Sequence, residues 1–334
     1  EKGYNVPLDM AMAFHTDAGT TLDDEMVGTL SIYTRFSNDK DVFPSGESRM
    51  LSRELADLIQ TQIVDDVRAQ YEDRWPRRGL WDRSYSESRT PEIPSMLLEL
   101  LSHQNLADMR YGADPRFRFV VSRAIYKAML RFQSQRYGFD YVVQPLPVNS
   151  FAAVLEDKGG DKPCVRLSWK PVDDPTEPTA SPESYIVYYN VEGGEAGHRV
   201  VSPKEGTSIT MEIEADAIYS FKVVAVNKGG VSFPSEELSV GTTSDWKNNY
   251  TVLVMNGFDR VSAPASYATK DSTKAGFQNH LDGGVAYIND YAYIGAQHEF
   301  RREIPWMDDD APGFGASYSN YESKVVAGNT FDYP

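Results

Sequence analysis

The sequence lacks the features that would place the chain in several broad classes of protein. Cys164 is its single cysteine, so no intrachain disulfide can form. No run of about 20 apolar residues occurs, so the sequence predicts no membrane-spanning helix. Basic residues are in deficit, and the net charge is -16 over 334 residues. This balance argues against nucleic acid or an anionic membrane as a partner, because both are bound through Lys and Arg patches.

The composition is that of a folded protein with more than one domain. Hydrophobic residues make up 41% and aromatic residues 12% of the chain, which is enough for packed cores. At roughly 100–200 residues per domain, the length predicts two or three domains. The chain opens at Glu1 without an initiator methionine or a signal peptide and closes on GNTFDYP without a terminal helix. We therefore expect a piece of a longer polypeptide.

Residues 1–143 alternate strand-like and helix-like segments, which predicts an α/β domain. Strands are expected over 8–14, where Thr16-Asp17-Ala18-Gly19 is the turn that ends the strand, and over 27–37 and 93–101; helices are expected over 52–71 and 117–138. Ser52 is expected to cap the first helix and Gly138 to end the second. One apolar face of the first strand is expected from its alternate residues Leu8, Met10, Met12 and Phe14.

His15 and Glu99 are the candidate chemical residues of this domain. His15 stands where a strand opens into a loop, and a lone histidine there is either a hydrogen-bonded structural residue or a metal ligand. Glu99 lies inside the apolar run SMLLELL, where an ionised carboxylate is costly unless it is paired or bound to a metal. Burial raises the pKa of a carboxyl, which suits a general base acting on a metal-bound water. We expect the two side chains to lie close together at the carboxyl edge of the sheet, as half of a zinc site.

Several segments of this domain resemble, in order, the zinc-dependent N-acetylmuramoyl-L-alanine amidases, the family often called Amidase_3. They are MAFHTDAG, VGTLSIYTRFS with the following SRELADLIQTQIVDDV, RRGL, and PSMLLELLSHQNLAD. The resemblance covers about residues 1–140. It implies that His15 is a Zn²⁺ ligand and that Glu99 is the catalytic acid/base. It also implies substrate contacts from Asp17 and Asn105, the latter matching the tail of the motif together with Asp108.

The resemblance further implies ligands that precede this sequence. The family takes a His and a Glu from upstream of the His15 position, so we expect a missing segment of the same polypeptide, an open sheet edge beside His15, and a chain that is inactive alone. Leu101 and Ser102 replace the Gly-Phe pair usual after the glutamate. His103, four residues after Glu99, is a substitute ligand, a substrate contact, or a helix-start histidine bonded to backbone.

A different pattern follows the Pro-containing linker 144–149. Over 150–243, short alternating strands are separated by turns rich in Gly, Pro and Asp, which predicts a β-sandwich. LSWKP, YIVYY and IYSFKVVAVNKGGVSFPSE resemble a fibronectin type III domain. The resemblance implies a Trp169 buried between the sheets, a tyrosine corner at Tyr219, and a spacer or docking module. The adhesive tripeptide Arg-Gly-Asp is absent.

Residues 250–334 are expected to begin a third, truncated α/β domain, because TVLVMNG over 251–257 is typical of a buried strand. The acidic run Asp308, Asp309 and Asp310 offers oxygen ligands for calcium, but its spacing does not fit an EF-hand, so a solvated loop is expected. His280 and His298 have no metal-ligand spacing.

The order of these domains, followed by VLVMNGFDRVSAP, is similar to large secreted proteins of Bacteroidetes-type bacteria that are often labelled xanthan lyase. The sequence therefore predicts a zinc hydrolase that is secreted, periplasmic or at the cell surface, within a larger envelope assembly. It would cleave an amide of peptidoglycan or a related cell-surface glycan-peptide. One alternative is a non-catalytic surface or assembly protein that keeps an amidase-like shell. Another is a polysaccharide-acting enzyme of the xanthan lyase label, for which no basic cluster stands out.

Overall fold

The computed structural model describes residues 7–18, 21, 25–103, 105–192, 194, 197–202, 206–248, 252–254, 266–268, 270, 274–277 and 299–301. The chain divides into two compact units, the first built on residues up to Phe139 and the second on Asp140–Asn256. Each unit has its own sheet or sheets and its own hydrophobic core, so the chain is multidomain.

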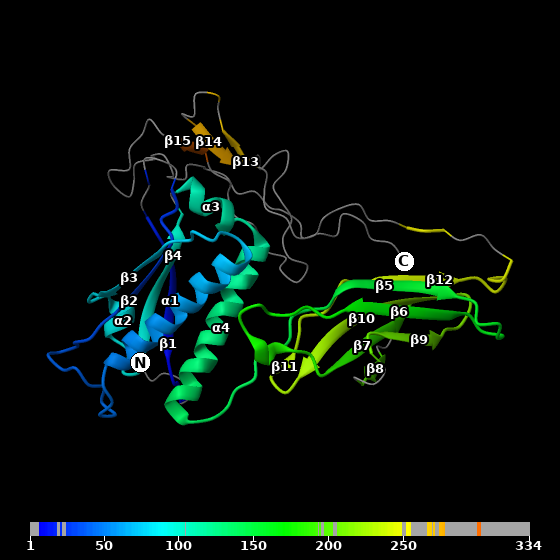
Figure 1. Ribbon diagram of the computed structural model, residues 1–334, viewed down its shortest axis with the longest axis horizontal. Coiled ribbons are helices and arrows are strands. Elements are labelled where there is room, and N and C mark those ends of the chain that lie inside the picture. Colours follow the sequence, from blue (N-terminus) through cyan, green and yellow to red (C-terminus); the bar gives the residue numbers. More distant parts are fainter. Residues whose placement is uncertain are drawn as a thin grey trace. The chain divides into compact units, whose positions relative to one another are not determined.

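A four-stranded sheet forms the centre of the first unit (Figure 1). Its strands are β1 (Ala11–Asp17), β2 (Thr29–Tyr33), β3 (Arg77–Asp82) and β4 (Ser95–Ser102), in the order β1-β4-β2-β3. β1 runs parallel to β4 and β2 runs parallel to β3, whereas β2 and β4 are antiparallel. Within the described part of the chain, β1 pairs with β4 alone. Among the described strands β1 is therefore an edge strand, and the open edge beside His15 stays a prediction.

Two long helices cover one face of this sheet. α1 (Met50–Gln70) and α4 (Pro115–Tyr137) lie side by side (Figure 1). α2 (Ser86–Arg89) is a single turn that contacts β1, β2 and β4, and α3 (Leu106–Gly112) follows β4. No helix in the described ranges is long and apolar enough to cross a bilayer. The core between helices and sheet includes Leu55, Ile59, Ile63, Met96, Leu98, Phe117 and Val121.

The ends of the helices test two predictions. Ser52, the expected cap, lies inside α1, and its Oγ accepts a hydrogen bond from the Ser95 N–H at 3.0 Å. The residue before the helix is Arg49, which makes no side-chain capping bond. The Ser52 prediction is wrong because this buried hydroxyl bonds to a neighbouring strand. Gly138 ends α4 with a φ of 69°, a left-handed conformation that glycine adopts without strain, as predicted.

The first strand covers its apolar residues only in part. Met10 and Met12 pack against the core under the helices. Leu8 lies before β1, and Phe14 is 51% exposed. The sequence places Leu8 in this strand and a turn from Thr16 onward, and both expectations are wrong, because β1 begins at Ala11 and continues through Asp17. β1 is an edge strand of the described sheet, so one neighbour covers it where an inner strand would have two.

The second unit is a sandwich of two antiparallel sheets. One sheet consists of β5 (Asn149–Glu156), β6 (Cys164–Lys170) and β9 (Ser208–Glu212). The other consists of β7 (Ser184–Val191), β8 (Gly197–Val201), β10 (Ala217–Asn227), β11 (Gly230–Val231) and β12 (Leu238–Thr242). A 3-10 turn over Pro178–Ala180 precedes β7.

The core of the sandwich is organised around Trp169. The indole is buried and packs edge-on against Tyr185, with ring centroids 5.3 Å apart. The Tyr219 hydroxyl accepts a hydrogen bond from the Glu214 N–H at 3.1 Å and so ties β10 to the chain five residues upstream. Both arrangements are those that the sequence predicts for a fibronectin type III domain. Cys164 is a buried free thiol.

Little of the last 85 residues is described. Three short antiparallel strands are present, β13 (Ser266–Ala268), β14 (Lys274–Phe277) and β15 (Glu299–Arg301). The three described residues of the expected strand 251–257 are Val252, Leu253 and Val254, and all are exposed and outside any strand. That expectation is wrong for them, since an apolar run becomes a buried strand only where neighbours pair with it. The expectations for the acidic run at 308–310 and for residues 280 and 298 lie outside the described residues.

Candidate functional site

His15 and Glu99 lie next to each other in the first unit. They are directly paired residues of the parallel strands β1 and β4. Paired residues on neighbouring strands project from the same face of a sheet, and such strands are about 4.8 Å apart. The two side chains are therefore neighbours, as the sequence predicts.

Glu99 is the most unusual carboxylate of this face. Every other residue of β4 is buried, and Glu99 is half-buried. Its Oε2 atom is buried and has no hydrogen-bond partner among the described residues. Removal from water raises the pKa of Glu99, and the negative charge of Asp17 raises it further, while His15 and Arg78 act in the opposite direction. A carboxyl of this kind can hold a proton closer to neutral pH than an exposed glutamate.

Asp17 forms an ion pair with an arginine of β3, the strand at the opposite edge of the sheet. Arg78 Nη1 donates to Asp17 Oδ2 at 2.7 Å, and both side chains are largely buried. The other Asp17 oxygen accepts a hydrogen bond from the Ala18 N–H. The expected substrate contact is thus engaged in an ion pair beside Glu99, where it contributes charge to the site.

The two histidines of the region have different neighbours. His15 Nε2 lies 3.9 Å from Glu87 Oε1, so α2 reaches the site through this carboxylate. His103 Nδ1 forms a hydrogen bond with Thr16 Oγ1 at 3.1 Å. The backbone N–H of His103 donates to the Asp17 carbonyl. His103 is therefore bonded at the end of β1, one residue along the strand from His15.

Asn105 and Asp108 support the loops around the site. Asn105 is buried, its side-chain oxygen accepts from the Ala107 N–H, and its amide donates to the Glu25 carbonyl at 2.8 Å. The bond from Ala107 caps α3, and the expected substrate contact of Asn105 stays a prediction. Asp108 accepts from the backbone N–H groups of Val27 and Ser102. Burial raises the pKa of Asp108 to about 6 against the effect of these bonds.

The described residues do not by themselves fit a zinc ion. A catalytic zinc needs about three protein ligands and an open position. No group of three His, Cys, Asp or Glu side chains that could hold a metal occurs in the described part of the chain. His15 is a suitable single ligand, whereas Asp17 is paired with Arg78.

Sequence reasoning gave no role to Arg78, Trp81 or Glu87, which the structure brings to the same region. Arg78 pairs with Asp17, Glu87 approaches His15, and Trp81 is an exposed indole of β3. The available signal was the density of arginine and tryptophan in RWPRRGLWDR. That signal does not indicate which of these side chains lie on the same face of the sheet as Glu99, because the face depends on the register of β3.

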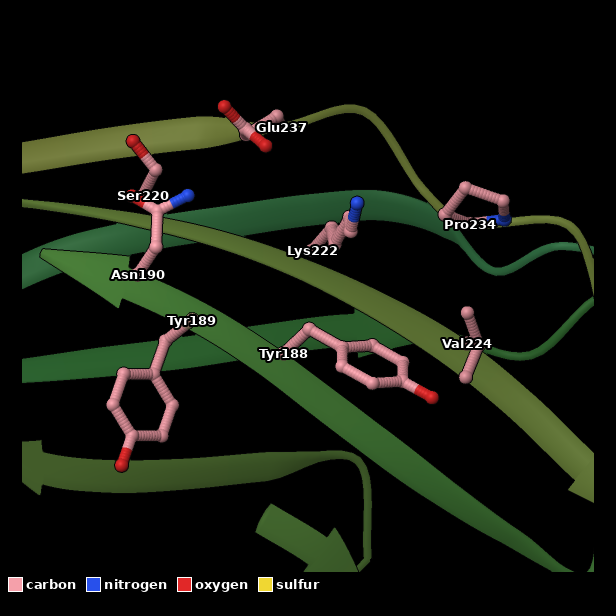
Figure 2. Close-up of a pocket in the computed structure, with 8 residues that line it drawn as sticks. All are labelled: Tyr188, Tyr189, Asn190, Ser220, Lys222, Val224, Pro234 and Glu237. Atoms are coloured by element: carbon pink, nitrogen blue, oxygen red, sulfur yellow. The ribbon is translucent and has the colours of Figure 1, made fainter. Parts of the chain in front are cut away.

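The second unit has a groove on the outer face of its larger sheet (Figure 2). Its volume is about 360 Å³, within the range of small-ligand sites. Figure 2 shows the Tyr188 ring and the Lys222 side chain between Asn190 at one end and Val224 with Pro234 at the other. The remaining lining residues are Tyr189, Ser220 and Glu237. The Ser220 hydroxyl of this lining is hydrogen-bonded to the Ser239 hydroxyl at 2.8 Å.

The comparisons with known proteins concern the second unit. Residues 156–241 match the family described as the Fibronectin type III domain. With the buried Trp169 and the Tyr219 bond, this match establishes that the second unit contains such a domain. A search of curated proteins found no match.

Similar solved structures are of the same kind. The FN5 domain of Drosophila Lar is 18% identical, with 30% of this chain and 97% of that chain covered and a TM-score of 0.24. The FN3 domain of human collagen XX is 17% identical, with 30% and 98% covered and a TM-score of 0.22. The twitchin kinase region from C. elegans is 25% identical, with 32% and 18% covered and a TM-score of 0.26.

Proposed function

We propose that the first unit is a hydrolase domain of the zinc-dependent N-acetylmuramoyl-L-alanine amidase type. The observation that carries the proposal is the buried, unpartnered Oε2 of Glu99 directly beside His15 on one face of the sheet. The substrate would be peptidoglycan or a related cell-surface glycan-peptide. Such a substrate lies outside the cytoplasm, so the proposal includes a secreted, periplasmic or cell-surface location.

Glu99 would act as the general acid/base. Hydrolysis of an amide requires a group that takes a proton from the attacking water and a group that delivers one to the leaving nitrogen. One carboxyl can do both in turn if its pKa lies closer to neutral than that of an exposed glutamate. The desolvation of Glu99 and the charge of Asp17 raise its pKa in that direction. The unpartnered Oε2 leaves an acceptor for the water.

Zinc remains part of this proposal as an expectation from the resemblance. Zinc in such a site polarises the carbonyl and the attacking water. His15 would supply one ligand. Since the described residues offer no group of three ligands, the others would come from residues outside the described ranges.

A second candidate function is a non-catalytic surface or assembly protein. The observation in its favour is the approach of Glu87 Oε1 to His15 Nε2 at 3.9 Å, a contact that a structural histidine would also make. In this case the amidase-like shell and the fibronectin type III domain would serve docking alone. The two candidates differ in whether the protein cleaves its substrate, and only the first requires Glu99 for that cleavage.

The experiment is a cleavage assay on purified peptidoglycan sacculi with the full-length protein and added zinc. We expect new N-terminal alanine in the soluble products, and its loss in the E99Q variant. E54Q is the matched control, because Glu54 is an exposed carboxylate on α1 far along the sequence from the site. Release of alanine termini by E99Q at the rate of the parent protein would exclude the proposed role of Glu99. No release by the parent protein would favour the non-catalytic candidate.

A further inference from the structure

An exposed tryptophan of β3 shares a face of the sheet with Glu99. In the β2–β3 ladder Ile32 pairs with Trp81, and in the β2–β4 ladder Ile32 pairs with Leu97. Ala13 of β1 pairs with Leu97 in turn. Paired residues project from the same face, so these four side chains form one row across the sheet.

The catalytic candidates form the adjacent row. His15 pairs with Glu99, and Glu99 pairs with Leu30, two residues along each strand from Ala13, Leu97 and Ile32. Residues two apart on a strand lie on the same face. Trp81 and Glu99 therefore face the same side, and two strand spacings, about 10 Å, separate their strands.

Trp81 stands out in its row because it is open to solvent. Leu97 and Ile32 are 2% exposed, whereas Trp81 is 42% exposed. A solvent-exposed indole next to buried apolar side chains is suited to stacking against a flat, partly apolar group. The face of its ring also attracts cations. Burial in the core does not explain this side chain.

Two arginines accompany the indole. The guanidinium carbons of Arg78 and Arg83 lie 5.6 Å and 5.8 Å from its ring centroid. Arg78 is paired with Asp17. Arg83 Nη1 donates to the Asp82 carbonyl at 3.3 Å, and no carboxylate partner of Arg83 is found among the described residues. Arg83 thus offers a cation beside an exposed aromatic ring.

The charge of this segment is opposite to that of the chain. Residues 74–89 contain five arginines and two carboxylates, in a chain whose net charge is -16. Arg74, Arg77 and Arg78 are paired with carboxylates, so the cationic surface here consists of the exposed Arg83 and Arg89, for which no carboxylate partner is found among the described residues. Such a surface attracts anionic groups, and a guanidinium binds a carboxylate through paired hydrogen bonds. The segment continues from Arg83 into α2, whose Glu87 approaches His15, so this surface borders the candidate site.

We infer that Trp81 and Arg83 form a binding site for a saccharide that carries a carboxylate, with the sugar ring on the indole and the carboxylate on the guanidinium. The inference rests on the proposed function in one respect: the ligand is identified with a muropeptide whose scissile amide reaches Glu99. A saccharide-peptide conjugate is long enough to contact both rows of the face, which a small free acid is not.

The test is binding by the full-length protein carrying E99Q, which prevents cleavage during the measurement. The probes are a purified disaccharide tetrapeptide from peptidoglycan, uncharged chitotetraose and an oligogalacturonate. We expect the disaccharide tetrapeptide to bind in calorimetry, and the added W81A or R83Q substitution to raise its Kd about tenfold or more. Because Trp81 and Arg83 are exposed, the melting temperature should be unchanged.

W246A is the matched control, because Trp246 also lies beside a cation, with Lys247 Nζ 5.2 Å from its ring, but belongs to the second unit. Its Kd should equal that of the parent. Equal affinity of the parent and W81A for every probe would overturn the inference, as would tighter binding of chitotetraose than of both acidic probes. Binding of oligogalacturonate alone, lost in W81A, would support the saccharide site and reject the amidase substrate. Loss of binding in W81A together with an inactive parent enzyme would likewise retain the site and reject the proposed reaction.

Discussion

Glu99 lies opposite His15 on parallel strands, and no hydrogen-bond partner of its buried Oε2 is found in the part of the chain that the structure describes. Such an atom lowers the stability of a fold, because the group has lost its hydration and gained no bond in return. Sites that carry chemistry often retain groups of this kind at the expense of stability. The pairing thus makes predictions about stability that do not depend on any assay of activity.

Replacing Glu99 with glutamine should stabilise the first unit at neutral pH. The folded pKa of Glu99 is raised, first by burial and then by Asp17. A carboxyl whose pKa is higher in the folded than in the unfolded state stabilises the fold below its unfolded pKa, about 4.3. This stabilisation is lost as the pH rises through the folded pKa. The E99Q variant should therefore melt a few degrees higher than the parent at pH 7.5 and close to it at pH 4. A lower melting temperature for E99Q at pH 7.5 would contradict this account of Glu99.

Asp108 should be a stabilising residue whose contribution shrinks as the pH rises. Its carboxyl accepts from the Val27 and Ser102 N–H groups, so D108A leaves two buried donors unpaired, at a cost of roughly 2–4 kcal/mol. Its pKa is raised to about 6 by burial, so part of the stability it contributes is lost between about pH 4 and 6. Urea unfolding should show a larger deficit for D108A at pH 4 than at pH 7.5. A loss of stability in D108A that grows with pH would contradict a raised pKa of Asp108.

The sequence predicted those parts of the fold that depend on local pattern. The helix ending at Gly138, the buried strand around Glu99 and the sandwich core at Trp169 follow from periodicity and from residue types that fit one conformation. Ser52 was misassigned because a hydroxyl before an apolar stripe looks the same whether it caps a helix or bonds to a strand that is distant in sequence.

The site was predicted in part, and for a similar reason. His15 and Glu99 follow strand-like runs, which places them at one edge of a sheet. The Arg78–Asp17 pair joins strands at opposite edges, and Trp81 shares a face of the sheet with Glu99 only through the register of β2 with both of its neighbours. Register across an antiparallel and a parallel ladder is set by tertiary packing and has no signature in a single sequence.

Trp169→Ala should destabilise the second unit and leave the first unit unaffected. Truncation of a large core aromatic costs about 3–5 kcal/mol, and the indole is 3% exposed. The two units have separate cores, so differential scanning calorimetry should show a shift in one transition only. W246A serves as the control, since Trp246 is partly exposed and should shift neither transition. A shift of both transitions by W169A would indicate that the units unfold together.

Replacing one partner of a buried ion pair in the first unit should lower the stability of the fold, whereas replacing both partners together should lower it much less. Lys127 Nζ lies 2.6 Å from Asp66 Oδ2, and both side chains are 1% exposed. Removing the lysine alone leaves a buried carboxylate without its cation, which costs about 3–5 kcal/mol. K127M should therefore lose this much in urea unfolding, and the K127M/D66L double variant should recover most of it. A double variant as unstable as K127M would show that the pair is itself strongly stabilising.

Asp17 and Arg78 should shift the protonation of Glu99 in opposite directions. Asp17 raises the pKa of Glu99 by repelling its negative form, and Arg78 lowers it by attracting that form. The two are joined at 2.7 Å, so D17N removes the repulsion and also leaves the guanidinium unneutralised. The pKa of Glu99 should fall in D17N. In R78M the cation is lost and the Asp17 charge remains, so the pKa should rise. Carbon NMR of side-chain-labelled glutamate, with the Glu99 signal assigned by its absence in E99Q, measures both shifts without reference to catalysis. If the first unit is an amidase, the acid limb of its pH profile should move with them. The absence of a shift in both variants would show that burial alone sets the protonation of Glu99.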